Sequence, residues 1–113
     1  MATPIRMVMR WMVPIGQTRA ISDALNAVML ATRKERGCLG CSVATEAGAR
    51  ATLLYQEDWD TEESLMQQVR SRHFVTLVGL VESAIEPPRV EFMLPTGTRG
   101  LDYAEEVRRK TTR

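Results

Sequence analysis

The run of residues 53–63 constrains the fold more than any other stretch, because it indicates a strand that passes directly into a helix. Tyr55, Glu57 and Trp59 are spaced two apart, so on a strand their side chains point to one face. A carboxylate beside an indole at the end of a strand can line a pocket under the following helix. The alternative is that the pair contributes core packing and a surface ion pair.

Size and charge narrow the class of protein. A chain of 113 residues is expected to form one domain. It carries 15 Lys and Arg against 14 Asp and Glu, so its net charge is near zero. This balance argues against nucleic acid as the main partner, because phosphate binding requires a basic surplus on one face. No apolar run approaches the ~20 residues that span a bilayer, and the N-terminus lacks the hydrophobic region of a signal peptide. We therefore expect a cytoplasmic protein with neither nucleic acid nor a membrane as its partner.

Cys38 and Cys41 form a C-x-x-C pair, a pattern found in redox and metal sites. Redox pairs usually lie at a helix N-terminus, whereas this pair follows Gly37 and opens a strand-like run. Residues three apart on a strand face opposite ways, so the two thiols should not converge. No second C-x-x-C completes a zinc site. We expect structural thiols and no bound metal.

Hydrophobic periodicity predicts the first half of the chain as strand, helix and hairpin. Residues 5–13 alternate as a strand, and a helix is expected from an N-cap at Thr18 to about Arg36. Residues 38–45 and 51–59 should then pair across a turn.

The second half of the chain predicts two helical stretches and a last strand. A short helix over 61–70 is expected to be capped by Asp60, with Glu63 completing a capping box. The helix that restarts at Ser71 should bury a face reaching Ile85. A strand over 89–94, a loop and a weak terminal helix follow.

The order β-α-β-β-α-β predicts an α+β, ferredoxin-like fold. Its antiparallel sheet would have both helices on one face, and a second copy is the simplest cover for the other face. Apolar residues on both faces of strand 5–13 favour such a homodimer, with Arg6 and Arg10 as interface or rim residues. We place the domain at 1–97 and a partly helical tail at 98–113, with residues 100–103 docking on the partner subunit.

Short motifs in a fixed order resemble the antibiotic biosynthesis monooxygenase (ABM) family across most of the chain. They are a Pro-x-Gly break, R-x-x-x-G-C-L, E-x-W, S-x-H-F and R-G-L-D-Y, at residues 14–16, 33–39, 57–59, 71–74 and 99–103. The resemblance implies a dimeric α/β barrel in which two ferredoxin-like protomers pack sheet against sheet. Some members of that family are cofactor-free monooxygenases that oxidise quinols or polycyclic phenols, and the resemblance implies this activity as an expectation.

Two departures from the family pattern bear on the chemistry. Members often carry a His six residues before the Phe of S-x-H-F, where this chain has Gln68, which cannot act as a general base near neutral pH. Relatives of the wider superfamily that cleave haem are similar to one another in their site residues, which are an Asn on the first strand, a Trp and a His. The single Asn of this chain, Asn26, falls in the first predicted helix, so haem degradation is not expected.

A cofactor-free oxygenase needs a base, a dry cavity and groups that steady a phenolate. Either Glu57 or His73 could take the proton, and aromatic rings could stack on the substrate. Gln68 and Arg72 could hold its oxygen. We therefore predict a catalytic set of Glu57, Trp59 and His73, and a substrate-binding set of Tyr55, Gln68, Arg72 and Met9.

Three functions remain open from the sequence. The first is a homodimeric oxidoreductase that oxidises a small quinol or aromatic phenol with O₂, without metal or flavin. The second is a non-catalytic or stress-associated module that binds a small apolar or aromatic molecule, and the third is a structural or regulatory partner without a ligand. Under the plainer interpretations, Glu57 pairs with a basic neighbour, Trp59 belongs to the core and His73 supports a helix turn.

Overall fold

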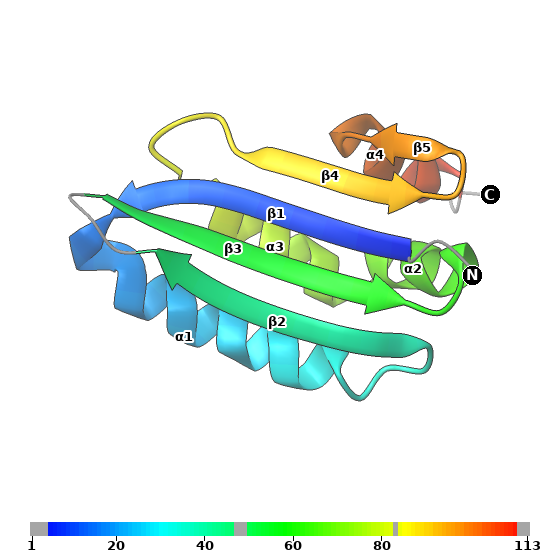
Figure 1. The fold of residues 1–113 in the computed structure, drawn as a ribbon, viewed down its shortest axis with the longest axis horizontal. Helices are drawn as coiled ribbons and strands as arrows, with labels where there is room; N and C mark the ends of the chain where they lie inside the picture. Colours follow the sequence, from blue (N-terminus) through cyan, green and yellow to red (C-terminus); the bar gives the residue numbers. More distant parts are fainter. Residues whose placement is uncertain (1–4, 47–49, 83, 111–113) are drawn as a thin grey trace.

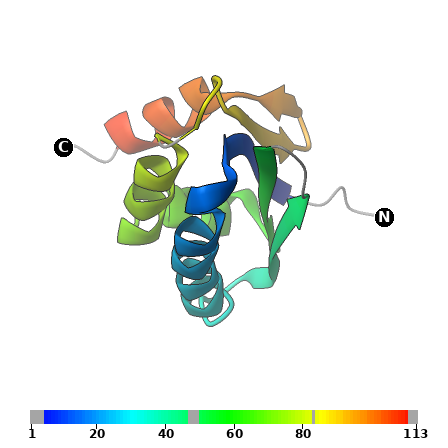
Figure 2. The same cartoon turned by 90° about the vertical axis from the view of Figure 1, so that its left-hand side faces the viewer.

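A computed structural model describes residues 5–46, 50–82 and 84–110 of the chain. These residues form one antiparallel sheet of five strands in the order β2-β3-β1-β4-β5, with the helices packed on a single face (Figures 1 and 2). The strands are β1 (Ile5–Pro14), β2 (Cys38–Glu46), β3 (Arg50–Trp59), β4 (Arg89–Leu94) and β5 (Gly97–Arg99). The helices are α1 (Ile15–Thr32), α2 (Glu62–Val69), α3 (Arg72–Val81) and α4 (Leu101–Arg109). The predicted α+β, ferredoxin-like fold is confirmed.

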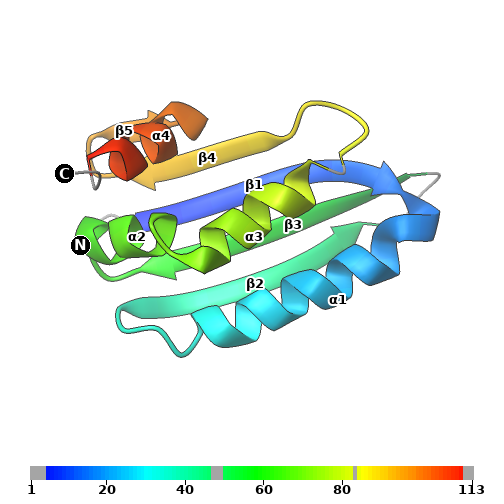
Figure 3. The same cartoon turned by 180° about the vertical axis from the view of Figure 1, so that it is seen from behind.

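The central strands β1 and β3 set the layering of the molecule. They run antiparallel along their whole length, with Met9 opposite Tyr55 and Met7 opposite Glu57. Alternate residues of both strands are buried under the helices, as the two-residue periodicity predicts. The helices cover this face when the sheet is seen from behind, with α1 over β2 and β3, and α4 beside β4 (Figure 3). None of the helices in these residues is both long and apolar enough to cross a membrane.

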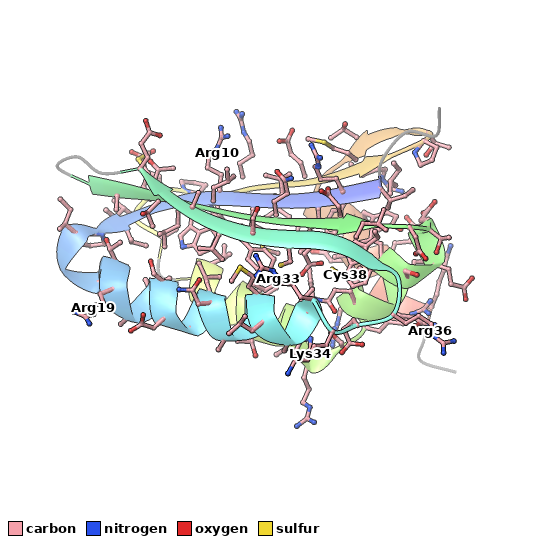
Figure 4. The ribbon with its side chains drawn as sticks, turned by 60° about the horizontal axis from the view of Figure 1, so that its bottom comes forward. Arg10, Arg19, Arg33, Lys34, Arg36 and Cys38 are labelled. Atoms are coloured by element: carbon pink, nitrogen blue, oxygen red, sulfur yellow. The ribbon has the colours of Figure 1, made fainter. Side chains whose placement is uncertain are left out.

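The opposite face of the sheet has no covering element among the described residues. It carries an ion pair between Arg6 Nε and Asp58 Oδ1 at 2.6 Å. Arg10 stands out from this face, away from the helices (Figure 4). Between these charges lie half-buried apolar side chains, namely Val8, Met12, Leu54 and Met93. We call this surface the open face.

Helix α1 differs from its predicted bounds at both ends. It begins at Ile15 rather than after Thr18, because Pro14 has φ −60° and leads straight from the strand into the helix. The Thr18 hydroxyl instead donates to the Pro14 carbonyl oxygen at 3.5 Å. The helix ends at Thr32, not near Arg36.

Gly37 lies in the loop after α1, where its φ of +89° favours glycine. A Cβ at this position would come within 2.3 Å of Ser64 Oγ and 2.6 Å of Asp60 Oδ1. The Gly37 carbonyl oxygen also accepts from Asp60 N at 2.9 Å. The glycine therefore lets the α1–β2 loop lie directly against the start of α2.

The cap of α2 and the end of α3 also differ from prediction. Thr61, not Asp60, caps α2, and its hydroxyl oxygen accepts from Ser64 N at 3.1 Å. The predicted Asp60–Glu63 capping box is thus wrong by one residue. Helix α3 ends at Val81, and Ile85 is 45% exposed because the chain turns back there, where its N–H donates to the Met12 carbonyl oxygen.

The C-terminal segment folds onto its own chain in this structure. The predicted boundary after residue 97 falls inside β5, which pairs with β4. In α4, Tyr103 is 3% exposed and its ring lies 5.0 Å from that of Phe92. Leu101, by contrast, is 44% exposed. Tyr103 thus makes its apolar contact with β4 of its own chain, and the expectation that residues 100–103 dock on a partner subunit stays a prediction. Residues 111–113 of the predicted tail lie outside the described residues.

The two cysteines do not alternate across β2 as predicted. A bulge between Cys38 and Gly40 adds one residue, so Cys38 lies opposite Trp59 and Cys41 opposite Glu57. Since Trp59 and Glu57 share a face, both cysteines lie on the helix-covered side of the sheet. Both are free thiols, as expected, and burial raises the pKa of Cys41 to about 12. A thiol with so high a pKa is a poor nucleophile.

Candidate functional site

A buried carboxylate is the chemical centre of the helix-covered face. Glu57 lies on β3 with its side chain 0% exposed. The indole Nε1 of Trp59 donates to Oε1 at 3.0 Å, and the hydroxyl of Tyr55 donates to Oε2 at 2.5 Å. The amide Nε2 of Gln68, from α2, donates to the same Oε2 at 2.8 Å. Side chains two apart on one strand thus meet an amide from the helix above, and together they satisfy an otherwise costly buried charge.

Two further side chains extend this hydrogen-bond network. Thr32, the last residue of α1, accepts from Gln68 Nε2 at 3.1 Å, and its Oγ1 lies 3.5 Å from Tyr55 Oη. Cys41 Sγ donates to Tyr55 Oη at 3.2 Å. We call Thr32, Cys41, Tyr55, Glu57, Trp59 and Gln68 the Glu57 network. It joins α1, α2, β2 and β3, so it also fixes how these elements pack.

Burial dominates the electrostatics of the network. Loss of water raises the pKa of Glu57 above its usual value, and the hydrogen bonds from Tyr55, Gln68 and Trp59 only partly oppose this. Burial and the neighbouring Glu57 also raise the pKa of Tyr55 well above its usual range, so its phenol stays neutral and serves as a donor. A buried carboxyl group with a raised pKa and a defined set of hydrogen-bond partners is a candidate general acid or base.

His73, the second residue of α3, has a small electrostatic influence on this carboxylate. It lowers the pKa of Glu57, against the larger effect of burial. Its Nδ1 is buried without a hydrogen-bond partner among the described residues. Such an unsatisfied nitrogen is uncommon in a folded protein and is available to a bound group.

The network borders a small hollow that opens to solvent. Its walls are Trp59 of β3, Ser64, Gln67 and Gln68 of α2, and the loop residues Glu35 and Arg36. The hollow has a volume of about 170 Å³. Trp59 and Gln68 both line it and both donate to Glu57, so they connect the buried carboxylate to the surface. The hollow lies beside the C-terminal end of α1, where Arg33, Lys34 and Arg36 gather (Figure 4).

The predicted site residues fall into two groups in space. Tyr55, Glu57, Trp59 and Gln68 form direct hydrogen bonds with one another, and His73 is close enough to influence the charge. Met9 is 0% exposed and lies opposite Tyr55 in the sheet, where it packs against the network. Arg72 is exposed at the start of α3 and makes no hydrogen bond to these residues.

Thr32 and Cys41 belong to the network, although the sequence analysis placed neither of them in the candidate site. The predicted hairpin did contain a signal for Cys41, because it pairs the strand of Cys41 with the strand that carries Glu57. No comparable signal exists for Thr32. Its position depends on where α1 ends, which the sequence placed four residues too late.

Comparison with known proteins identifies the family and the fold. The sequence profile of the antibiotic biosynthesis monooxygenase family matches residues 4–79, more than half of the chain. The chain belongs to this family. Among curated proteins, none matches it.

Solved structures share the fold at low sequence identity. A protein of Mycobacterium tuberculosis has a TM-score of 0.65 at 22% identity, covering 82% of this chain and 95% of that one. A conserved protein of Methanosarcina mazei Go1 has a TM-score of 0.65 at 27% identity, covering 79% and 89%. A structure described as antibiotic biosynthesis monooxygenase has a TM-score of 0.68 at 13% identity, covering 80% and 96%. At these identities the likeness concerns the fold.

Proposed function

We propose that this chain is a cofactor-independent monooxygenase that oxidises a small phenol or quinol with O₂, and that Glu57 is its general base. The observation that carries the proposal is the buried Glu57 carboxylate, whose pKa is raised and which reaches a solvent-open hollow through Trp59 and Gln68. A family whose members include monooxygenases supports the same reaction class.

The proposed reaction begins with transfer of the phenolic proton to Glu57. The electron-rich phenolate passes one electron to O₂, and the resulting phenoxyl radical and superoxide combine at a ring carbon. Glu57 returns the proton to this peroxide, which loses water and leaves one oxygen atom on the ring as a carbonyl. Trp59 and Gln68 donate to the two oxygens of Glu57, so in this proposal they hold the carboxylate in place as it exchanges the proton.

The size of the hollow favours a compact substrate. Its volume of about 170 Å³ lies below the roughly 300–1,000 Å³ of pockets that hold drug-sized ligands. We therefore propose a single-ring phenol or quinol rather than a polycyclic one.

The active form in this proposal is a homodimer that covers the open face. Val8, Met12, Leu54 and Met93 leave apolar surface there that a second copy would bury. Sedimentation at micromolar concentration checks the dimer, and a folded monomer at that concentration would rule it out.

Oxygen consumption by the metal-stripped protein tests the reaction. We expect uptake above the autoxidation blank for single-ring quinols, with ¹⁸O₂ supplying one labelled atom to the product. Glu57→Gln should lower kcat by about 10²–10⁴-fold. Glu63→Gln is a matched control, because it makes the same change on an exposed side chain of α2 and should leave kcat unchanged. Equal turnover by the wild type and Glu57→Gln would remove Glu57 from this role.

A second candidate function is binding without turnover. Both oxygens of Glu57 already accept hydrogen bonds from side chains of its own chain, as in a structural network. A folded protein without uptake across the panel, but with ligand-induced changes in Trp59 fluorescence, would favour this binding module.

A further inference from the structure

A groove lies between residues of α3 and residues of α4. Both helices lie on the same side of the sheet (Figure 3). Helix α4 packs against α2 and β4, so the side of α3 that faces it is left uncovered. The hollow between the two helices has a volume of about 430 Å³. That volume falls in the range of roughly 300–1,000 Å³ typical of small-molecule sites. No residue of the Glu57 network lines this groove.

The groove is apolar over most of its surface. Val75 is 54% exposed and Leu101 is 44% exposed, and both line it together with Phe74, Val78 and Ala104. The ring of Phe74 also packs against the core, where it lies 6.4 Å from the ring of Phe92. Large apolar side chains gathered in an exposed concavity mark a binding surface.

Gly79 keeps the groove open at the α3 wall. It lies inside a helix, where glycine costs about 0.5–1 kcal/mol relative to alanine. A Cβ at this position would meet no atom of the described residues within 4 Å. Packing therefore gives no reason for a glycine here, whereas an open groove does.

The charges on the walls are mainly negative. Glu82 on α3 and Glu105 on α4 both line the groove, and neither forms an ion pair with a described residue. The third charged residue, Arg108, is held at the α2 side, where its guanidinium donates to the Val69 carbonyl oxygen at 2.7 Å. A ligand with an apolar body and one positive charge complements this arrangement.

We propose that the α3–α4 groove binds a hydrophobic organic amine. Its apolar body lies along Phe74, Val78 and Leu101, and its ammonium group lies within reach of Glu82 and Glu105. The site is separate from the Glu57 network, so its occupancy does not depend on the proposed oxygenase reaction.

Calorimetric titration of the full chain with decyltrimethylammonium, below its micelle concentration, tests the charge preference. Decanoate is the matched probe, with a similar chain and the opposite charge. We expect one ammonium probe per chain, bound at least about tenfold more tightly than decanoate, which corresponds to about 1.4 kcal/mol. Equal or tighter binding of decanoate, or no saturable binding of either probe, would overturn the proposal.

Substitutions at Gly79 test the location. Gly79→Leu should fill the groove and weaken ammonium binding at least about tenfold. Gly79→Ala is the control, because it adds only a methyl group, should retain binding and should raise the melting temperature. Leu101→Lys provides a second test at an exposed position and should also weaken ammonium binding. Unchanged binding in both Gly79→Leu and Leu101→Lys would place the probe elsewhere.

Removing the wall charges tests the ammonium contact. The double variant Glu82→Gln, Glu105→Gln should reduce the preference for the ammonium probe to about threefold or less. Glu63→Gln, an exposed carboxylate on α2, should not change it. Self-association of the wild type that Gly79→Leu abolishes would assign the groove to a second copy of the chain, and this result would also overturn the proposal.

Discussion

The two faces of the sheet accommodate charged side chains in different ways. On the covered face, Met9, Leu53 and Tyr55 are 0% exposed, and Glu57, the one buried carboxylate among the described residues, is surrounded by hydrogen-bond donors. On the open face, Arg6 and Asp58 remain partly in water and form an ion pair with each other. A charged group can be buried only where neighbouring elements supply its hydrogen-bond partners. On the open face, water hydrates the charged groups instead.

The adjacent residues Leu53 and Leu54 give the strongest test of this difference, because they point to opposite faces of β3. We expect Leu53→Asp to unfold the chain, at a cost of more than about 4–5 kcal/mol, since it buries a charge without a partner. Leu54→Asp should keep the fold and dissociate the proposed dimer. Circular dichroism and sedimentation measure the two outcomes, and a folded Leu53→Asp chain would contradict the assignment of the faces.

The packing of Trp59 should give the next largest effect. Trp59→Ala is expected to lower the free energy of unfolding by about 3–5 kcal/mol, because the side chain is 2% exposed. Trp59→Phe retains most of the volume but removes the donor to Glu57, so it should cost about 1–3 kcal/mol. Urea melts measure both values. A loss of less than about 1 kcal/mol for Trp59→Ala would indicate that the indole lines open space rather than the core.

The titration of Glu57 should make stability depend on pH. Its pKa is raised in the folded state, so between its unfolded value, near 4.5, and its folded value the native state holds a proton that the unfolded state has lost. Stability from this group is therefore greatest below the unfolded pKa and falls as pH rises to the folded pKa. The slope should reach at most about 1.4 kcal/mol per pH unit. Glu57→Gln should flatten that slope in urea melts across pH, while Asp58→Asn on the open face should leave it in place.

Loss of the ion pair on the open face should have the smallest effect on the free energy of unfolding. Arg6→Ala is expected to change the free energy of unfolding by only about 0.2–1 kcal/mol, because both side chains of the pair remain partly exposed. The effect should shrink further in high salt. Thermal melts at low and high ionic strength measure it, and a larger, salt-independent loss would mean that the pair is buried in an assembly.

Local periodicity alone was enough to determine most of the fold. The two-residue alternation of strands 5–13 and 51–59 depends only on backbone geometry, so it correctly placed Tyr55, Glu57 and Trp59 on one face. The order of the elements followed from the same reasoning. The family was predicted from short motifs in a fixed order, and the family profile confirms it. Helix ends were less predictable, because Pro14 and Thr61 each moved a cap by a few residues.

Contacts between distant segments were decided only by the tertiary structure. Gln68 reaches Glu57, and Thr32 reaches Gln68, because α1 and α2 both pack against β3, and no local pattern encodes that approach. The bulge in β2 brought both cysteines to the covered face, where simple alternation had separated them. The sequence by itself thus determined which residues face inward, since that property repeats along the backbone. Which of them touch depends on how whole elements pack together.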